Sequence, residues 1–123
     1  MDTDAAKQLV CDEVDRRTQQ LLETSHHLHA HPELGYEEVE AHGLLTSLLA
    51  AAGLEPERHA YGIDTAFAAR HGRVDGPTVA VCLEYDALPG IGHACGHNVI
   101  AAAGLGAGLA AATVVHDLSL IHI

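Results

Sequence analysis

Apolar residues recur at helical spacing along the first thirty positions of the chain. From about Asp4 to Ala30 they follow a period of three or four residues: Leu9, Val10, Val14, Leu21, Leu22 and Leu28. Acidic residues crowd the first half of this stretch, where they suit the positive end of a helix dipole. Pro32 biases His31 away from the helical region, so we expect one helix that ends near this point.

The next apolar stretch predicts a second helix from about Glu37 to Ala52, followed by Gly53 as a C-terminal cap. Two short strands are expected at about 57–61 and 65–71.

Two further elements complete the pattern. Thr78 to Leu83 is apolar and rich in β-branched residues, which favours a strand covered on both faces at the centre of a sheet. After a loop from Asp86 to Gly96, a helix rich in alanine and glycine begins near Asn98, a suitable cap residue. This order of elements predicts an α/β layered domain.

Length and charge narrow the function. The 123 residues suffice for one modest domain. The formal net charge is −11, and this field would repel nucleic acid and anionic membranes, so we expect neither as a partner. The uncharged stretch from Val99 to Val115 is mostly alanine and glycine and has no flanking Lys or Arg. It therefore favours a buried helix over a membrane span.

The cysteines indicate a reducing compartment. Three of them are too few for a disulfide scaffold, and Cys11 and Cys82 lie in patterns that predict reduced core residues. The acidic start lacks the basic and apolar segments of a secretory signal. A cytoplasmic location is the expectation.

Candidate chemistry gathers in the loop after the buried strand, where open α/β sheets place their ligands. Cys95 and His97 are suitable ligands for zinc and similar divalent ions, and Gly96 between them allows both to face one ion. Asp86 would accept a hydrogen bond from a ligand histidine and fix its orientation. Short patterns of this kind are usually not metal sites, so His93 as a loop cap and Asp86 as a solvated strand end stay open at this point.

Two longer motifs carry a family resemblance. Residues 84–98, Glu-Tyr-Asp-Ala-Leu-Pro-Gly-Ile-Gly-His-Ala-Cys-Gly-His-Asn, resemble the metal-site signature of the Cys-Gly-His branch of the M20 metallopeptidase and amidohydrolase family. Residues 28–38, Leu-His-Ala-His-Pro-Glu-Leu-Gly-Tyr-Glu-Glu, resemble the N-terminal motif of the same branch. Within it the chain looks closest to Xaa-Arg and β-alanyl-lysine dipeptidases, with aminobenzoyl-glutamate and auxin-conjugate hydrolases as relatives.

The resemblance implies a fold and a reaction. The fold would be the three-layer α/β/α catalytic domain of the M20 type, of which the chain would hold the N-terminal portion. Cys95 and His97 would be metal ligands and Asp86 the catalytic carboxylate that orients the site. Two divalent ions are implied, zinc or manganese, with cobalt as a further candidate. A metal-activated water would cleave the amide bond of a dipeptide or N-acyl amino acid.

The chain departs from the family motif at two positions, and two alternative functions stay open. Glu84 stands where most of the wider family has a ligand histidine, and Asn98 replaces the aspartate of many branch members. Aminoacylase or amino-acid-conjugate hydrolysis is the alternative within enzymes. A non-catalytic metal-binding module is the alternative outside them, although closed structural zinc sites normally need four protein ligands.

Two other patterns attract attention. Four histidines crowd one helix end, and His27 and His31 have the spacing of two ligands on a helical face. No glutamate lies between them as a zincin motif requires, which favours a structural or pocket-wall role. Gly106 and Gly108 mimic part of a dinucleotide fingerprint, but no strand precedes them, so a helix-packing role is expected.

The ends of the chain carry a further expectation. No credible general base follows His97, so residues 1–117 are expected to be inactive alone. The resemblance implies that they are the N-terminal part of a longer, homodimeric hydrolase. Residues 118–123 resemble translated adapter sequence and are expected to be a non-native tail.

Overall fold

The computed structural model describes residues 1–115 and 119–122. Its elements, in chain order, are α1 (Thr3–Arg16), α2 (Thr18–Ala30), α3 (Val39–Ala51), β1 (Glu57–Arg58), the 3-10 turn η1 (Ala60–Gly62), β2 (Phe67–Gly72), β3 (Thr78–Val81), α4 (His97–Ala112) and β4 (Ser119–His122). The predicted α/β class is confirmed. The predicted boundary between residues 117 and 118 lies outside the described residues.

The first helix of the sequence pattern is two helices in the structure. Asp2 caps α1, its Oδ1 accepting from the backbone N–H of Ala5 at 2.8 Å. At Arg17 the backbone leaves helical geometry, with φ −94° and ψ 5°, and α2 begins at the next residue. None of the residues of α1 is buried, so the prediction that Cys11 is a core residue is wrong. A helix that touches its neighbours along one edge leaves most of its surface in solvent.

The strands form one four-stranded sheet in the order β1-β2-β4-β3. Strand β2 pairs antiparallel with β1 and β4, and β3 pairs parallel with β4. The sequence pattern predicts a central strand for the whole domain, and in the described sheet β3 lies at the edge. Thr78, Val79 and Ala80 are exposed, so the expected cover on both faces is absent from the described residues. Cys82, just past the end of β3, is exposed too, contrary to prediction, while Leu83 is buried.

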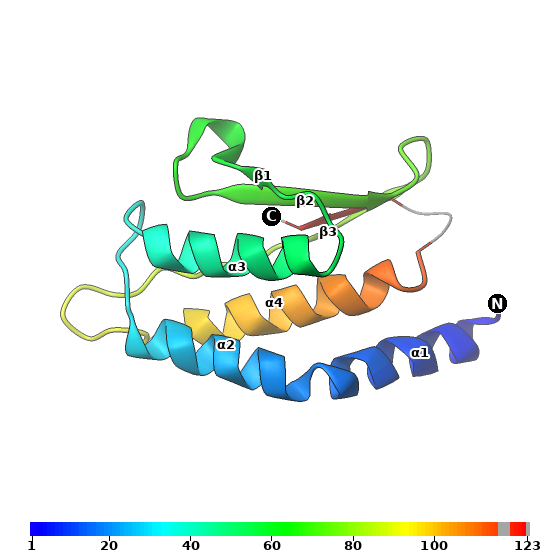
Figure 1. Cartoon of the computed structure of the whole chain (residues 1–123), viewed down its shortest axis with the longest axis horizontal. Helices are drawn as coiled ribbons and strands as arrows, with labels where there is room; N and C mark the ends of the chain where they lie inside the picture. Colours follow the sequence, from blue (N-terminus) through cyan, green and yellow to red (C-terminus); the bar gives the residue numbers. More distant parts are fainter. Residues whose placement is uncertain (116–118, 123) are drawn as a thin grey trace.

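The helices of the described residues lie on one side of the sheet (Figure 1). Helices α3 and α4 lie nearest to the strands, and α1 and α2 run beneath α4, so α4 is covered on both sides. The core joins these elements through buried apolar side chains: Leu28 of α2, Leu45 and Leu49 of α3, Phe67 of β2, Leu83, and Leu105 and Leu109 of α4. No helix in the described part of the chain is both long and apolar enough to span a bilayer.

Glycines let α4 approach both of its neighbours closely. A Cβ added at Gly104 would lie 2.7 Å from Cβ of Leu83, and one added at Gly106 would lie 2.7 Å from Cδ1 of Leu21 on α2. The glycine pattern is therefore a packing feature, as predicted. It lets the helix fill the narrow space between α2 and the end of β3.

Replacing these glycines by alanine should destabilise the protein unequally. Gly104→Ala should cost about 1–3 kcal/mol of unfolding free energy, because Cβ of Leu83 moves only with its backbone. Gly106→Ala should cost less, since the end of the Leu21 side chain can rotate away. Chemical denaturation measures both changes.

The matched control is Gly43→Ala in α3. Nothing lies within 4 Å of its added Cβ, so the gain in helix propensity should stabilise the protein by about 0.5–1 kcal/mol. Equal effects at all three positions would contradict the packing role of the α4 glycines.

A buried histidine links α3 to the sheet. His42 is only 7% exposed, and its Nε2 lies 3.1 Å from the carbonyl oxygen of Ala66. Burial lowers the pKa of His42 below its ordinary value of 6.5. The nearby His59, whose ring stacks on it, and Arg58 lower this pKa further, while the hydrogen bond to Ala66 acts in the other direction. The native state therefore holds this imidazole neutral.

This shift predicts acid sensitivity. Because the unfolded chain takes up the proton at a higher pH than the folded one, stability should be lost as the pH falls from about 6.5 through the lower native pKa. His42→Gln keeps an N–H for Ala66 but cannot titrate. The unfolding free energy of the wild type relative to this variant should fall between about pH 7.5 and pH 5. A difference that is constant over this range would contradict the prediction.

Candidate active site

The loop between β3 and α4 is fastened to the loop between α2 and α3. The backbone N–H of Ala87 donates to the carbonyl oxygen of Glu33 at 2.7 Å, and Leu34 forms an isolated parallel bridge with Ala87. Both loops lie at the same end of the molecule (Figure 1). Two segments that carry the sequence motifs, far apart along the chain, therefore meet.

Glycines shape the second half of this loop. Gly90 and Gly92 adopt positive φ angles of 77° and 61°, and the N–H of Leu88 donates to the carbonyl of Gly92 across the turn. Gly96 has φ 85° and is the N-cap of α4, so the chain turns sharply between Cys95 and His97. Residues that carry a Cβ rarely adopt these backbone conformations.

The prediction that Asn98 caps α4 is wrong. The helix begins at His97, one residue earlier, so Asn98 lies inside its first turn. Its buried side chain instead donates from Nδ2 to Oγ of Ser25 at 3.0 Å and to the Ser25 carbonyl at 3.3 Å. Asn98 thus joins the start of α4 to α2.

Asp86 and His97 form the central pair of the site. Nδ1 of His97 lies 2.7 Å from Oδ1 of Asp86 and 3.0 Å from the Asp86 carbonyl oxygen. Both side chains are partly exposed, His97 at 24% and Asp86 at 38%. A neutral His97 that donates from Nδ1 to this carboxylate leaves Nε2 with a free lone pair. The contact holds the ring in one tautomer and one orientation.

Cys95 lies two positions before His97 and is exposed. Within the described residues, the group of three ligand atoms that lie within 4.8 Å of one another is not here but at His27, His31 and Glu40. The loop thus brings Asp86 and His97 into contact, whereas Cys95 stands at its edge with the thiol open to solvent.

His93 is buried behind the pair, a position that sequence reasoning missed when it considered a loop cap. It is 7% exposed, and its Nδ1 has no hydrogen-bond partner among the described residues. Burial lowers the pKa of His93, and the neighbouring His29 and His97 lower it further, against the opposing effect of Asp86. A neutral imidazole is therefore favoured behind the site.

A cavity of about 330 Å³ opens beside Asp86. On its wall, Thr65 donates from Oγ1 to Oε2 of the buried Glu38 at 2.7 Å, and Tyr85 donates from its hydroxyl to the Thr65 carbonyl. Burial raises the pKa of Tyr85, and the nearby Glu38 raises it further, so the phenol stays a neutral donor. Sequence reasoning did not assign Glu38, although it lies in the quoted N-terminal motif.

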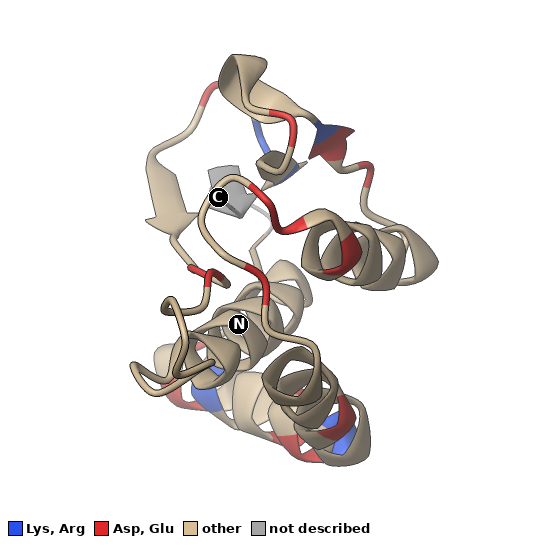
Figure 2. Cartoon of the chain, turned by 90° about the vertical axis from the view of Figure 1, so that its left-hand side faces the viewer, with Lys and Arg blue, Asp and Glu red and all other residues tan. Residues whose placement is uncertain are grey.

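The charge of this end suits a cation. Figure 2 views the molecule from the loop end, and acidic segments lie along the loops there, whereas the few basic segments lie elsewhere. The sequence holds no Lys or Arg between Arg17 and Arg58 or after Arg73. The field at the two loops is therefore negative.

No protein-family model matches the chain. Curated relatives do. The chain is 40% identical over 113 residues to the Xaa-Arg dipeptidase of Mus musculus, and 36% identical over 104 residues to the N-acetyl-L-cysteine deacetylase of Bacillus subtilis. These matches cover 84% and 72% of the chain. A solved B. subtilis structure, described as a dinuclear metal binding peptidase of the M20 family, superposes with TM-score 0.75 and 26% identity over 85% of the chain. The chain belongs to the M20 amidohydrolase and peptidase family.

The family is one of enzymes, because these relatives are named as dipeptidases, deacetylases and hydrolases. This M20 chain spans about a quarter of the length of the curated relatives, 26% of the mouse dipeptidase and 24% of the B. subtilis deacetylase. It also covers 34% of the solved B. subtilis peptidase. A putative aminohydrolase of methicillin-resistant Staphylococcus aureus shares the fold, with TM-score 0.76 over 94% of the chain and 34% of that protein.

Proposed function

We propose that the whole protein hydrolyses the amide bond of a dipeptide or an N-acyl amino acid with the help of a divalent metal, and that the loop 84–97 supplies part of its active site. The observation that carries this proposal is the contact between Asp86 and His97, which leaves Nε2 of His97 free to bind a metal, two positions after the exposed Cys95. The names of the M20 relatives, among them Xaa-Arg dipeptidase and N-acetyl-L-cysteine deacetylase, support the substrate class.

The residues of the loop fit a metal ion of the zinc type. Cys95 offers a thiolate and His97 an imidazole Nε2, a donor pair that suits zinc. The carboxylate of Asp86 on Nδ1 of His97 is the usual partner of a ligand histidine, raising its basicity and fixing its ring. A zinc-type ion held by Cys95 and His97 would supply Lewis acidity and would lower the pKa of a bound water.

The chain's own residues then have distinct tasks. Asp86 is a positioning residue, because it acts on the site through the His97 ring. His93 presents a neutral ring behind the pair and adds no positive charge against a bound cation. Tyr85 and Glu38 line the adjoining cavity, and their hydrogen bonds to the carbonyl and the hydroxyl of Thr65 fix the shape of its wall.

The finer features belong to the same proposal. They are two ions per site, zinc or manganese, in a homodimer that works in the cytoplasm. The relatives named deacetylases support amino-acid-conjugate hydrolysis as the second candidate. A panel of dipeptides and N-acetyl amino acids separates the two by the ratio of their kcat/KM values.

Removing either proposed ligand tests the site. In the full protein, Cys95→Ala and His97→Ala should each abolish hydrolysis and lower the bound metal measured by elemental analysis, because each removes a donor atom. Cys82→Ala is the matched control, since it deletes another exposed thiol outside the loop. Wild-type rate and metal content in the two loop variants would remove Cys95 and His97 from the site.

Asp86→Asn tests the positioning role. The amide no longer offers a full negative charge to Nδ1–H of His97, so turnover and metal affinity should fall about 10–100-fold while the melting temperature changes little. The control is Glu55→Gln, an exposed acid in the α3–β1 turn. Unchanged turnover would show that Asp86 is only a solvated acid at the strand end.

A further inference from the structure

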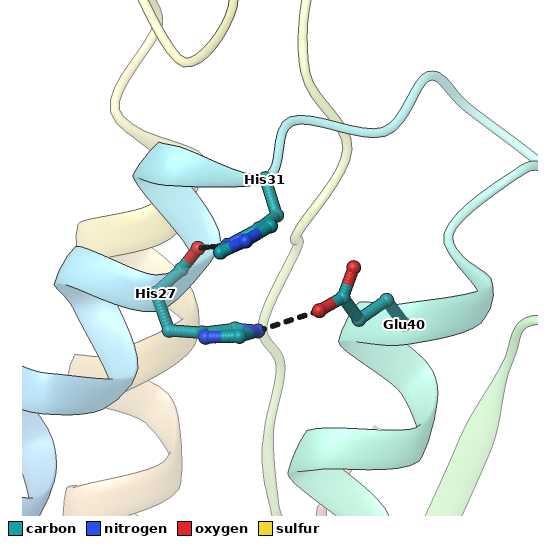
Figure 3. A group of neighbouring side chains, drawn as sticks. All are labelled: His27, His31 and Glu40. Atoms are coloured by element: carbon teal, nitrogen blue, oxygen red, sulfur yellow. Dashed lines mark hydrogen bonds and ion pairs between the residues drawn. The ribbon is translucent and has the colours of Figure 1, made fainter.

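A second cluster of potential ligands lies between the end of α2 and the start of α3. Figure 3 shows His27, in the last turn of α2, and His31, the C-cap residue of this helix, facing Glu40 in the first turn of α3. One ligand atom from each side chain lies within 4.8 Å of the other two. The cluster contains no thiol and shares no residue with the loop 84–97.

Hydrogen bonds hold two of its members in place. Nδ1 of His31 lies 2.8 Å from the carbonyl oxygen of His27, so the ring donates to the backbone and leaves Nε2 with a lone pair. Glu33 accepts from the backbone N–H groups of Glu40 and Ala41 through its two carboxylate oxygens, at 2.9 and 2.8 Å. This fixes the first turn of α3 and the backbone from which Glu40 extends.

The third member already faces its partner. Nε2 of His27 lies 2.9 Å from Oε1 of Glu40, where one proton joins the two atoms. A metal ion can take the place of that proton, because a neutral imidazole and a carboxylate are both ligands once the proton leaves. Donation from the second imidazole to a backbone carbonyl is the arrangement that orients ligand histidines in metal sites.

We propose that His27, His31 and Glu40 bind a divalent transition-metal ion of the zinc type at this helix junction. Two histidines and one carboxylate are a known zinc ligand set with a fourth position left for water. Zinc bonds of this kind imply ligand separations of about 3.3 Å in a tetrahedron, so modest rotations of the side chains complete the site. The side chains of His27 and Glu40, 38% and 51% exposed, have room to make them.

Access and charge favour a cation at this place. A groove of about 550 Å³ lies between α2 and α3, and His27 lines it together with Glu23 and, from α1, Arg16, whose guanidinium is paired with Glu13. No Lys or Arg lies between Arg17 and Arg58 in the sequence, whereas Glu33, Glu37 and Glu38 flank Glu40. The alternative is a stacked histidine pair with an ordinary ion pair to Glu40, since the two rings lie 4.2 Å apart.

Cobalt substitution distinguishes these alternatives, because Co²⁺ reports its ligands by colour. In the full protein, Co²⁺ titration should reveal an equivalent whose absorption lacks a thiolate charge-transfer band and which depends on His31 and Glu40, in addition to the ions of the proposed active site. His31→Gln and Glu40→Gln should each weaken this equivalent by roughly tenfold or more. His26→Gln, an exposed neighbour on α2, should leave it unchanged. All three substituted side chains are exposed, so the variants should fold, and circular dichroism checks this.

The experiment tests the helix-junction site independently of the proposed active site at Cys95 and His97. Cys95→Ala should remove any thiolate band and keep the thiolate-free equivalent. The inference is overturned if the wild type binds no thiolate-free equivalent. It is equally overturned if His31→Gln and Glu40→Gln bind it as the wild type does, or if His26→Gln loses it to the same extent.

Discussion

The close approach of α4 to its two neighbours sets the dimensions of this molecule. Gly104 and Gly106 bring the helix against Leu83 on one side and Leu21 on the other, with no space for a methyl group. The start of α4 is fixed as a result, and with it His97 at the first helical position. Asn98 secures the same turn to Ser25 of α2. The histidine therefore meets Asp86 because its helix is held on both sides.

Much of the architecture follows from local sequence. The helix 37–52 was predictable because its apolar spacing is regular, and Gly53 closes it with a φ of +89°. The break at Arg17 was not predictable in the same way, because its neighbours continue the helical period and no proline or glycine marks it. The edge position of β3 depends on which strands pair with it, a long-range property that the apolar run Thr78–Leu83 does not encode.

In the candidate site, too, some features follow from the local sequence and others depend on contacts between distant segments. Residue types and the family motifs single out Asp86, Cys95 and His97, and their assigned roles stay predictions. The contact between Asp86 and His97 needs the turn at Gly96, whose positive φ a glycine signals only in general terms. Glu38, Thr65 and Tyr85 come from three separate segments, so no spacing in the sequence could have grouped them. Likewise, Glu40 completes the His27 and His31 pair only through the folded junction.

Glu33 acts on two segments at once. Its side chain holds the first turn of α3, and its backbone carbonyl holds Ala87 in the loop that carries Asp86. Local opening at either end would therefore release a restraint at the other, so the two loops are expected to open together. A ligand that rigidifies the helix junction would also order the loop 84–97 in part. Binding of a second ligand at that loop would then cost less conformational entropy, so each ligand would favour binding of the other.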